Sequence, residues 1–385
     1  MQVYKLRLTL GWIWVSLLFV SNIQAQNIEI TGKVVDAENN QPVEFANLGV
    51  IGTYLGTASD FNGDFSLSVG EEFADFKVQI SAVGYRPKEL SVNELLLLTP
   101  VTVKLLPQAY GIGQVDVKAE SKRLYGIVKS ASNMISDNYL KSYSAKVYFE
   151  QNNKTSQKTE AALLFSDAKG YGERSYSAAF ENRNYKIEEV RRNFDVIPLE
   201  SGLLHVQDIL DFDIVRVRGN VLDVNMVDQF KLDLKDEIVM NGDSVWVIAF
   251  EMEKPDMVST GDARIKSYKG LLYVNQKDQA IIRAEINAVS NGYFHAGRSA
   301  YKESEDSQLY EYNVGVDYRK FEAGYALSKI QYSALGSSGE AANKSEIKWI
   351  VYDVHSKSSV SGNTRQYFVD KESDPDFWKR FSVPE

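Results

Sequence analysis

Hydrophobic and polar residues alternate in short runs over the region after residue 26, which is the periodicity of β-strands. Five such runs lie at Ile28–Val35, Val43–Ile51, Phe65–Val69, Lys77–Val83 and Val101–Leu105. Gly, Asn, Asp and Pro separate these runs. The Asn-Gly pair at 62–63 is typical of a tight hairpin, because both positions favour positive φ. Short strands with turns at this spacing predict a β-sandwich over residues 26–107.

The pattern becomes helical over residues 122–138. Apolar residues recur there every three or four positions, and one face carries Leu124, Ile127, Val128, Ala131, Met134 and Ile135. Ser121 fits the N-cap of this helix. A second, shorter helix is predicted at 203–210. Residues 108–121, which include two glycines, form the predicted linker.

Strand patterns dominate the rest of the chain. They lie at Tyr143–Glu150, Ala161–Phe165, Phe230–Leu234, Val245–Glu251, Arg264–Val274, Ala280–Ala288, Tyr310–Tyr318, Tyr325–Ala334 and Glu346–Val354. Turns at 241–243 and 275–278 join consecutive strands, so the order is up-and-down. We therefore expect an α+β domain over 122–385, with a large curved antiparallel sheet and helix 122–138 as its cover. The predicted fold class is mainly β.

The first 25 residues have the pattern of a signal peptide. Lys5 and Arg7 precede an apolar run from Leu8 to Val20, and Ala25 ends a short polar stretch. The alternative is an uncleaved N-terminal anchor. No later run is long enough for a transmembrane helix, since Leu95–Leu98 and its neighbours make only a short piece. The mature chain is expected to be exported, and to be periplasmic, associated with the outer membrane, or secreted.

Composition narrows the classes of partner and chemistry. The chain of 385 residues has 22 Tyr and 18 Phe, which fits β structure. Its net charge of −9 argues against nucleic acid as a partner, because phosphate binding needs a cationic face. The absence of Cys excludes disulfides, thiolate metal sites and Cys nucleophiles.

An ordered series of turn and strand residues in the first domain resembles a known family. The series is Gly32–Asp36, Pro42-Val43, Ala46-Asn47, Gly52-Thr53, Gly56-Thr57, Asp60, Gly63–Phe65 and Val83–Tyr85. It resembles the carboxypeptidase regulatory-like domain of exported Bacteroidetes proteins. The resemblance implies a transthyretin-like, immunoglobulin-type sandwich of about seven strands. Ala58-Ser59 departs from the family, which often has Thr before the Asp.

The C-terminal region carries a weaker resemblance. The hairpin Gly270–Ile282 and the sequence Asp376-Phe377-Trp378 look like the tail of Bacteroidetes proteins that pair this region with the regulatory-like domain. The pattern of sheet plus helix is also similar to the half-barrel of lipoprotein-carrier proteins. That second likeness is one of architecture alone, so it implies a function only by analogy.

The family name does not imply peptidase activity. Zinc catalysis of that kind needs a His-x-x-Glu pair, and none of His205, His295 and His355 has Glu three residues later. Oxygen ligands alternate at Asp60, Asn62 and Asp64 as in a calcium loop, but the bidentate Glu is missing. We interpret this stretch as a hairpin turn in which side chains bond their own backbone.

The acidic pairs, the basic spots and the tyrosines each have a structural interpretation beside a functional one. The acidic pairs Asp211/Asp213 and Glu188/Glu189 could serve hydrolysis only if they faced each other across a cleft. The basic spots at Arg191, Arg192, Arg216 and Arg218 could hold an anion or could be solvated strand edges. Nine tyrosines could line a sugar or lipid surface or form cross-strand pairs: Tyr171, Tyr176, Tyr185, Tyr268, Tyr273, Tyr293, Tyr301, Tyr310 and Tyr312.

We therefore assign no catalytic, cofactor-binding or metal-binding residue. The leading hypothesis is a non-enzymatic envelope or surface protein, with the sandwich as a spacer or docking unit and the C-terminal sheet as the binding part. Its partner would be an envelope protein, a glycan or a lipid. A second hypothesis is a carrier of an acyl chain or other apolar ligand, which requires an open apolar concavity. A third is a hydrolase of polysaccharide or peptide, which requires convergent carboxylates or His in a cleft.

Overall fold

The structure of the chain is a computed structural model. The described residues are 27–51, 53, 55–107, 117–152, 157–172, 183–194, 209–240, 242–260, 262, 264–291, 310–336, 344–356 and 373–384. The predicted signal peptide, residues 1–25, lies outside them. Among the described residues, no helix combines the length and apolar character needed to cross a membrane.

The N-terminal unit is a sandwich of two sheets, counted over the described residues. The strands are β1 (Asn27–Asp36), β2 (Asn47–Val50), β3 (Gly56–Ala58), β4 (Asp64–Gly70), β5 (Lys77–Ser81), β6 (Lys88–Ser91) and β7 (Val101–Leu105). One sheet has the order β4-β1-β7 and the other β3-β2-β5-β6. Inward-facing Ile30, Val34, Leu48, Leu67 and Ile80 are fully buried between the two sheets. The helix α2 (Val92–Leu97) begins with a capping box of Ser91 and Glu94.

The C-terminal unit is one large antiparallel sheet. Its strands are β8 (Tyr143–Asn152), β9 (Lys158–Asp167), β10 (Arg183–Arg192), β11 (Phe230–Met240), β12 (Asp243–Met252), β13 (Ile265–Asn275), β14 (Ile281–Ser290), β15 (Tyr310–Phe321), β16 (Gly324–Gly336) and β17 (Lys344–His355). Within the described residues, the order is β10-β9-β8-β17-β16-β15-β14-β13-β12-β11. Consecutive strands are thus neighbours from β8 to β10 and from β11 to β17, whereas β10 and β11 lie at opposite edges and β17 returns to pair with β8. The fold class is mainly β, as predicted.

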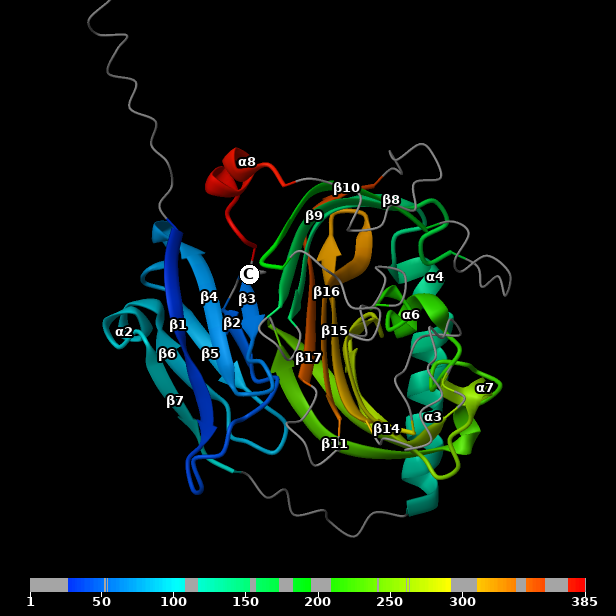
Figure 1. Cartoon of the computed structure of the whole chain (residues 1–385). Helices are drawn as coiled ribbons and strands as arrows, with labels where there is room; N and C mark the ends of the chain where they lie inside the picture. The colour runs from blue at the N-terminus through cyan, green and yellow to red at the C-terminus, as the bar shows by residue number, and fades with distance from the viewer. Residues whose placement is uncertain are drawn as a thin grey trace, which may run out of the picture.

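Helices cover the concave face of this sheet (Figure 1). They are α3 (Val117–Asn133), α4 (Ile135–Asn138) and α6 (Ile214–Val217), and α7 (Met257–Thr260) lies beside them. Leu124, Val128 and Ala131 of α3 are buried in the same core as the concave side chains of the strands. Tyr125 donates a hydrogen bond to the carbonyl oxygen of Phe230 at 2.7 Å, which fastens α3 to the start of β11.

The convex face is covered as well. The sandwich lies against it, and so does the C-terminal helix α8 (Pro375–Arg380) (Figure 1). Trp378 of α8 is buried against Tyr148 and Ile350, and its ring lies 4.4 Å from the Arg191 guanidinium carbon. Both faces of the large sheet are therefore packed over part of their area.

Several elements differ from their predicted limits. The helix starts at Val117, inside the predicted linker, so Ser121 lies within α3 and is not its cap. The helix breaks at Met134, where α4 follows. Most of the predicted helix at 203–210 lies outside the described residues, although residues 209 and 210 are helical. Strand β10 had no counterpart in the sequence prediction.

Candidate functional site

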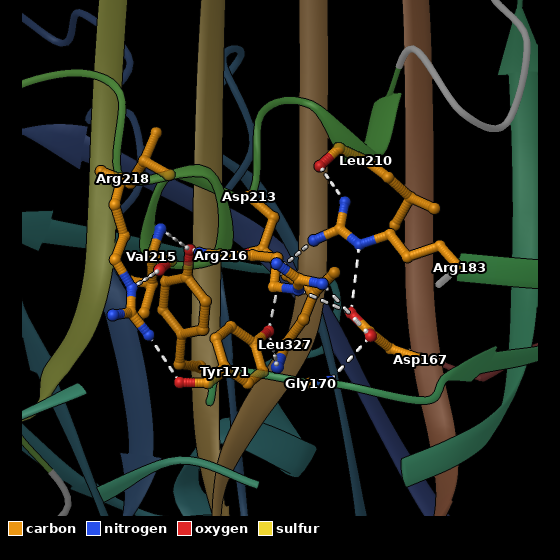
Figure 2. Close-up of polar contacts among 12 residues, drawn as sticks. Asp167, Gly170, Tyr171, Arg183, Leu210, Asp213, Val215, Arg216, Arg218 and Leu327 are labelled. Atoms are coloured by element: carbon orange, nitrogen blue, oxygen red, sulfur yellow. Dashed lines mark hydrogen bonds and ion pairs between the residues drawn. The ribbon is translucent and has the colours of Figure 1, made fainter. Parts of the chain in front are cut away.

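The most concentrated polar chemistry in the described residues lies on the concave side of the sheet (Figure 2). It lies under residues 209–222, which include α6 and which we call the covering segment. Asp167 ends β9 and Arg183 begins β10, while Asp213 and Arg216 belong to the first turn of α6. Arg183 contacts Asp167 at 3.3 Å and Asp213 at 3.0 Å, and Arg216 contacts Asp167 at 2.7 Å. Two guanidinium groups thus face two carboxylates, and the cluster is neutral as a whole.

Asp213 is the centre of this cluster. Its carboxylate accepts hydrogen bonds from the hydroxyls of Tyr171 and Tyr318, both at 2.9 Å, and from the backbone N–H of Arg216 at 3.2 Å. Burial raises the pKa of Asp213, although Arg183 and the two tyrosines act in the opposite direction. Burial opposes the charge of Arg183, but Asp213 and Asp167 together raise its pKa, so it stays a cation.

Backbone groups complete the cluster. Asp167 accepts from the backbone N–H of Gly170 at 2.7 Å, and Arg183 donates to the carbonyl oxygen of Leu210 at 2.8 Å. Arg218 donates to the carbonyl oxygens of Tyr171, at 2.5 Å, and Gly172. The bonds of Arg183 and Arg218 join the segment around α6 to the β9–β10 end of the sheet, whereas the Asp167–Gly170 bond shapes the turn after β9. These polar contacts hold the covering segment on the sheet.

Apart from this cluster, the buried concave interior is mainly apolar. Side chains of the covering segment are buried in the common core: Ile209, Leu210, Phe212, Ile214, Val215, Val221 and Leu222. They pack on aromatic residues of the strands, and Phe212 stacks on Tyr332 with ring centroids 5.4 Å apart. The polar cluster therefore fixes the apolar covering segment over the apolar concave face of the sheet.

Three of the four arginines predicted as possible anion sites are already engaged, and Arg192 lies at the end of β10. Arg216 pairs with Asp167, and Arg218 bonds the two backbone carbonyls. Arg191 pairs with Glu160 at 2.8 Å on the convex face and lies over Trp378. These three side chains serve internal contacts, which the sequence could not reveal because their partners are distant along the chain.

The predicted tyrosine surface is mostly interior. Tyr171, Tyr185, Tyr268, Tyr273 and Tyr312 are buried. Tyr310 lies in β15, and Tyr176, Tyr293 and Tyr301 fall outside the described residues. Tyr268 and Tyr312 pack in the concave core, whereas Tyr273 lies on the convex face and donates to Glu285 at 2.8 Å. These five buried tyrosines are thus packing residues, and four of them lie on strands as the cross-strand alternative requires.

The Asp60–Asp64 stretch is a turn. Asp60 accepts hydrogen bonds from the backbone N–H groups of Asn62 and Asp64, and Gly63 has a φ of 77°. Lys33 pairs with Asp64 at 3.1 Å. In the described part of the chain, no three His, Asp or Glu side chains gather in a way that could hold a metal ion.

A second carboxylate cluster lies on the convex face. Glu150 and Glu160 face each other across β8 and β9, and the hydroxyl of Tyr148 donates to both, at 2.8 and 2.7 Å. Burial alone would raise the pKa of Glu160, but Arg191, Tyr148 and Lys158 lower it to about 2. Hydrolysis by a carboxylate pair needs one of the two protonated near neutral pH. The pKa of Glu150 is lowered as well, so this pair does not meet that need.

Sequence comparison bears on the sandwich described above. Residues 30–115 match the CarboxypepD_reg-like domain. The match confirms the family resemblance of the N-terminal domain, which we call the regulatory-like domain below. The chain is also 37% identical over 95 residues to the TonB-dependent receptor SusC of Bacteroides thetaiotaomicron. That alignment covers 24% of this chain and only 9% of SusC.

Solved structures with some likeness to the chain are distant. A DUF1329 family protein from Desulfovibrio piger is 10% identical, with coverage of 62% of this chain and 93% of that one, at a TM-score of 0.26. A LolA superfamily protein from Nitrosomonas europaea is also 10% identical, with coverage of 61% and 94%, at a TM-score of 0.26. Likenesses at this level carry no argument about function.

Proposed function

We propose that the chain is a non-enzymatic binding protein of the cell envelope, in which the sheet domain holds an apolar ligand on its concave side. One observation carries this proposal: the two arginines and two aspartates of the central cluster pair with one another, and the side chains around them are mainly apolar. Asp167, Arg183, Asp213 and Arg216 use their polar atoms on each other and on nearby backbone. Such groups position a cover, whereas catalysis needs groups that meet a substrate.

An acyl chain is the ligand class that this face fits best. Burial of apolar surface supplies most of the free energy for binding such a chain, and it needs few polar contacts. The concave face offers a wide apolar surface that includes Ile248, Leu272, Ile286, Val314 and Ile330. The open concavity that a carrier requires is closed in this structure, because the covering segment and α3 bury these side chains. A ligand therefore enters only when that cover moves.

The rim of the concave side supports the same class of ligand. Met257 and Val258 on α7 are 56% and 72% exposed and lie next to each other. Exposed apolar side chains beside an apolar interior provide a first contact for a chain that leaves a membrane or another protein. The signal-peptide pattern and the similarity of the regulatory-like domain to a part of SusC support an envelope location.

A fluorescent fatty-acid probe tests this function. The mature chain, purified without detergent, is titrated with an alkyl probe such as dansyl-undecanoic acid. We expect saturable binding, and we expect Ala284→Trp to weaken it by about 10-fold or more by filling the concave side. Ala284 is fully buried in the concave core, whereas Val239 is exposed, so Val239→Trp is the matched control. Absence of saturable binding by the unmodified chain would contradict the proposal.

A further inference from the structure

Phe45 has an unusual backbone conformation in the regulatory-like domain. Its φ is 54°, a region that bulky residues seldom adopt, yet its side chain is buried. The fully buried Ser59 holds this conformation, because its hydroxyl accepts from the N–H of Ala46 and donates to the carbonyl of Val43, each at 2.8 Å. Strained positions of this kind persist where the surroundings fix them and often belong to functional contacts.

The Phe45 ring lies on the convex face of the large sheet. The guanidinium carbon of Arg283, on β14, is 5.1 Å from the centroid of this ring and 5.7 Å from that of Tyr273. Glu285 at 3.1 Å and Asp317 at 3.5 Å hold Arg283, which is only 1% exposed. A cation in this position is attracted to the faces of both rings.

Gly315 on β15 forms the floor under the same ring. A Cβ atom at this position would lie 3.0 Å from Cε1 of Phe45, so any side chain would push the ring away. The sheet therefore presents a pocket with a charged wall and a floor without a side chain. Its shape suits one flat aromatic side chain.

We propose that this pocket is a docking site for the regulatory-like domain and that Phe45 is the anchor. A second contact fixes the orientation of the domain, because Val83 packs against the buried cluster of Val245, Val247 and Tyr273 on the same face. Two contacts on different loops prevent rotation about either one. The regulatory-like domain is then bound to the sheet in one fixed orientation, rather than joined to it only by a flexible linker.

The pocket lies on strands whose opposite, concave face belongs to the core of the sheet domain. Arg283 and Gly315 alternate along β14 and β15 with Ala284 and Val316, whose side chains lie in the concave core. A docked domain therefore restrains the strands that line the concave side. This inference does not depend on the identity or the existence of a ligand there.

Distance measurement between spin labels tests the docking. The chain has no native Cys, so Glu38→Cys in the regulatory-like domain and Glu322→Cys in the sheet domain give two unique and exposed labelling positions. We expect one narrow distance distribution for this labelled full-length chain. Phe45→Ala removes the anchor from one side and Gly315→Leu blocks the pocket from the other, and each is expected to weaken docking by about 30-fold and to broaden the distribution.

The matched control is Phe76→Ala, which removes a ring that is 39% exposed in the regulatory-like domain. It should leave the distribution narrow. Circular dichroism checks that each variant is folded. If Gly315→Leu is not folded, the result for Phe45→Ala decides the test. A broad distribution in the parent chain overturns the proposal. An unchanged distribution in Phe45→Ala, or equal broadening by Phe76→Ala, also overturns it.

Discussion

Arg183 and Asp213 form an ion pair of 3.0 Å in which both side chains are almost completely withdrawn from solvent. The two residues come from the start of β10 and the start of α6, so the pair joins the sheet to the segment that covers it. A buried ion pair adds little stability compared with apolar residues, but removal of one partner leaves an uncompensated charge. The pair therefore specifies where the cover sits.

Replacement of Arg183 tests this role. We expect Arg183→Met to lower the free energy of unfolding by about 3–5 kcal/mol, because Asp213 would lose its ion pair with Arg183 and Asp167 would keep only Arg216. Urea unfolding at pH 7 gives this value. The control is Lys77→Met, which breaks an exposed pair with Glu89 and should cost less than about 1 kcal/mol. Similar losses in both variants would show that the buried cluster has no special role.

Glu160 predicts an acid-sensitive contribution to stability. Its pKa falls from 4.5 to about 2 because Arg191, Tyr148 and Lys158 outweigh the effect of burial. A lowered carboxyl pKa gives stability that is present above the unfolded value and is lost as the pH falls through the folded one. We expect the difference in unfolding free energy between the parent chain and Glu160→Gln to shrink by about 2 kcal/mol from pH 6 to pH 3.

The control for this measurement is Glu89→Gln on the surface. Glu89 pairs with an exposed lysine, so its difference from the parent chain should change little over the same range. A constant difference for Glu160→Gln would mean that its carboxylate is not held as the structure places it.

Two glycines should respond to alanine in opposite directions. A Cβ at Gly270 would lie 2.0 Å from the carbonyl oxygen of Glu285 and 2.6 Å from the Phe250 ring, whereas Gly126 in α3 has nothing within 4 Å. We expect Gly270→Ala to destabilise by about 3 kcal/mol, because a backbone atom of the neighbouring strand cannot move aside. Gly126→Ala should stabilise by about 0.5–1 kcal/mol. Thermal unfolding measures both, and equal signs would contradict the register of β13 and β14.

Lys329 predicts a change at alkaline pH. Burial lowers its pKa to about 8, with Lys348 and Arg283 adding to the effect and Asp317 opposing it. When a folded-state lysine has a lowered pKa, stability rises as the pH increases from the folded value to the unfolded value. Lys329→Met should therefore be more stable than the parent chain at pH 7, and this advantage should shrink by about 1 kcal/mol at pH 9.5. A difference in the free energy of unfolding between Lys329→Met and the parent chain that is equal at both pH values would contradict the lowered pKa of Lys329.

The elements that the sequence predicted well are those whose signals are local. Asn62-Gly63 marks a turn because positive φ suits glycine, and the strands from Phe230 onward alternate clearly. By contrast, β10 carries charged residues on both faces, with Glu160 and Trp378 as partners of Arg191, so its alternation is obscured. The start of α3 was misplaced because Val115 and Val117 alternate with polar residues and resemble a strand.

The contacts around Asp213 and around Phe45 could not be predicted from the sequence, because the residues that meet there are far apart along the chain. Asp213 lies 30 residues from Arg183 and 105 from Tyr318 along the chain. Each of these residues has an ordinary surface alternative when it is considered alone. Phe45 likewise looked like one more apolar residue of a strand region, and only the arrangement of the two domains gives it a partner in Arg283.

Native mass spectrometry of the full-length chain, exported from a Bacteroidetes host and purified without detergent, tests the central claim most directly. The account predicts a mass above that of the polypeptide, which organic extraction removes and which fragmentation assigns to molecules with acyl chains. A chain at its bare polypeptide mass that also takes up no fatty acid or phospholipid when these are added would contradict the account.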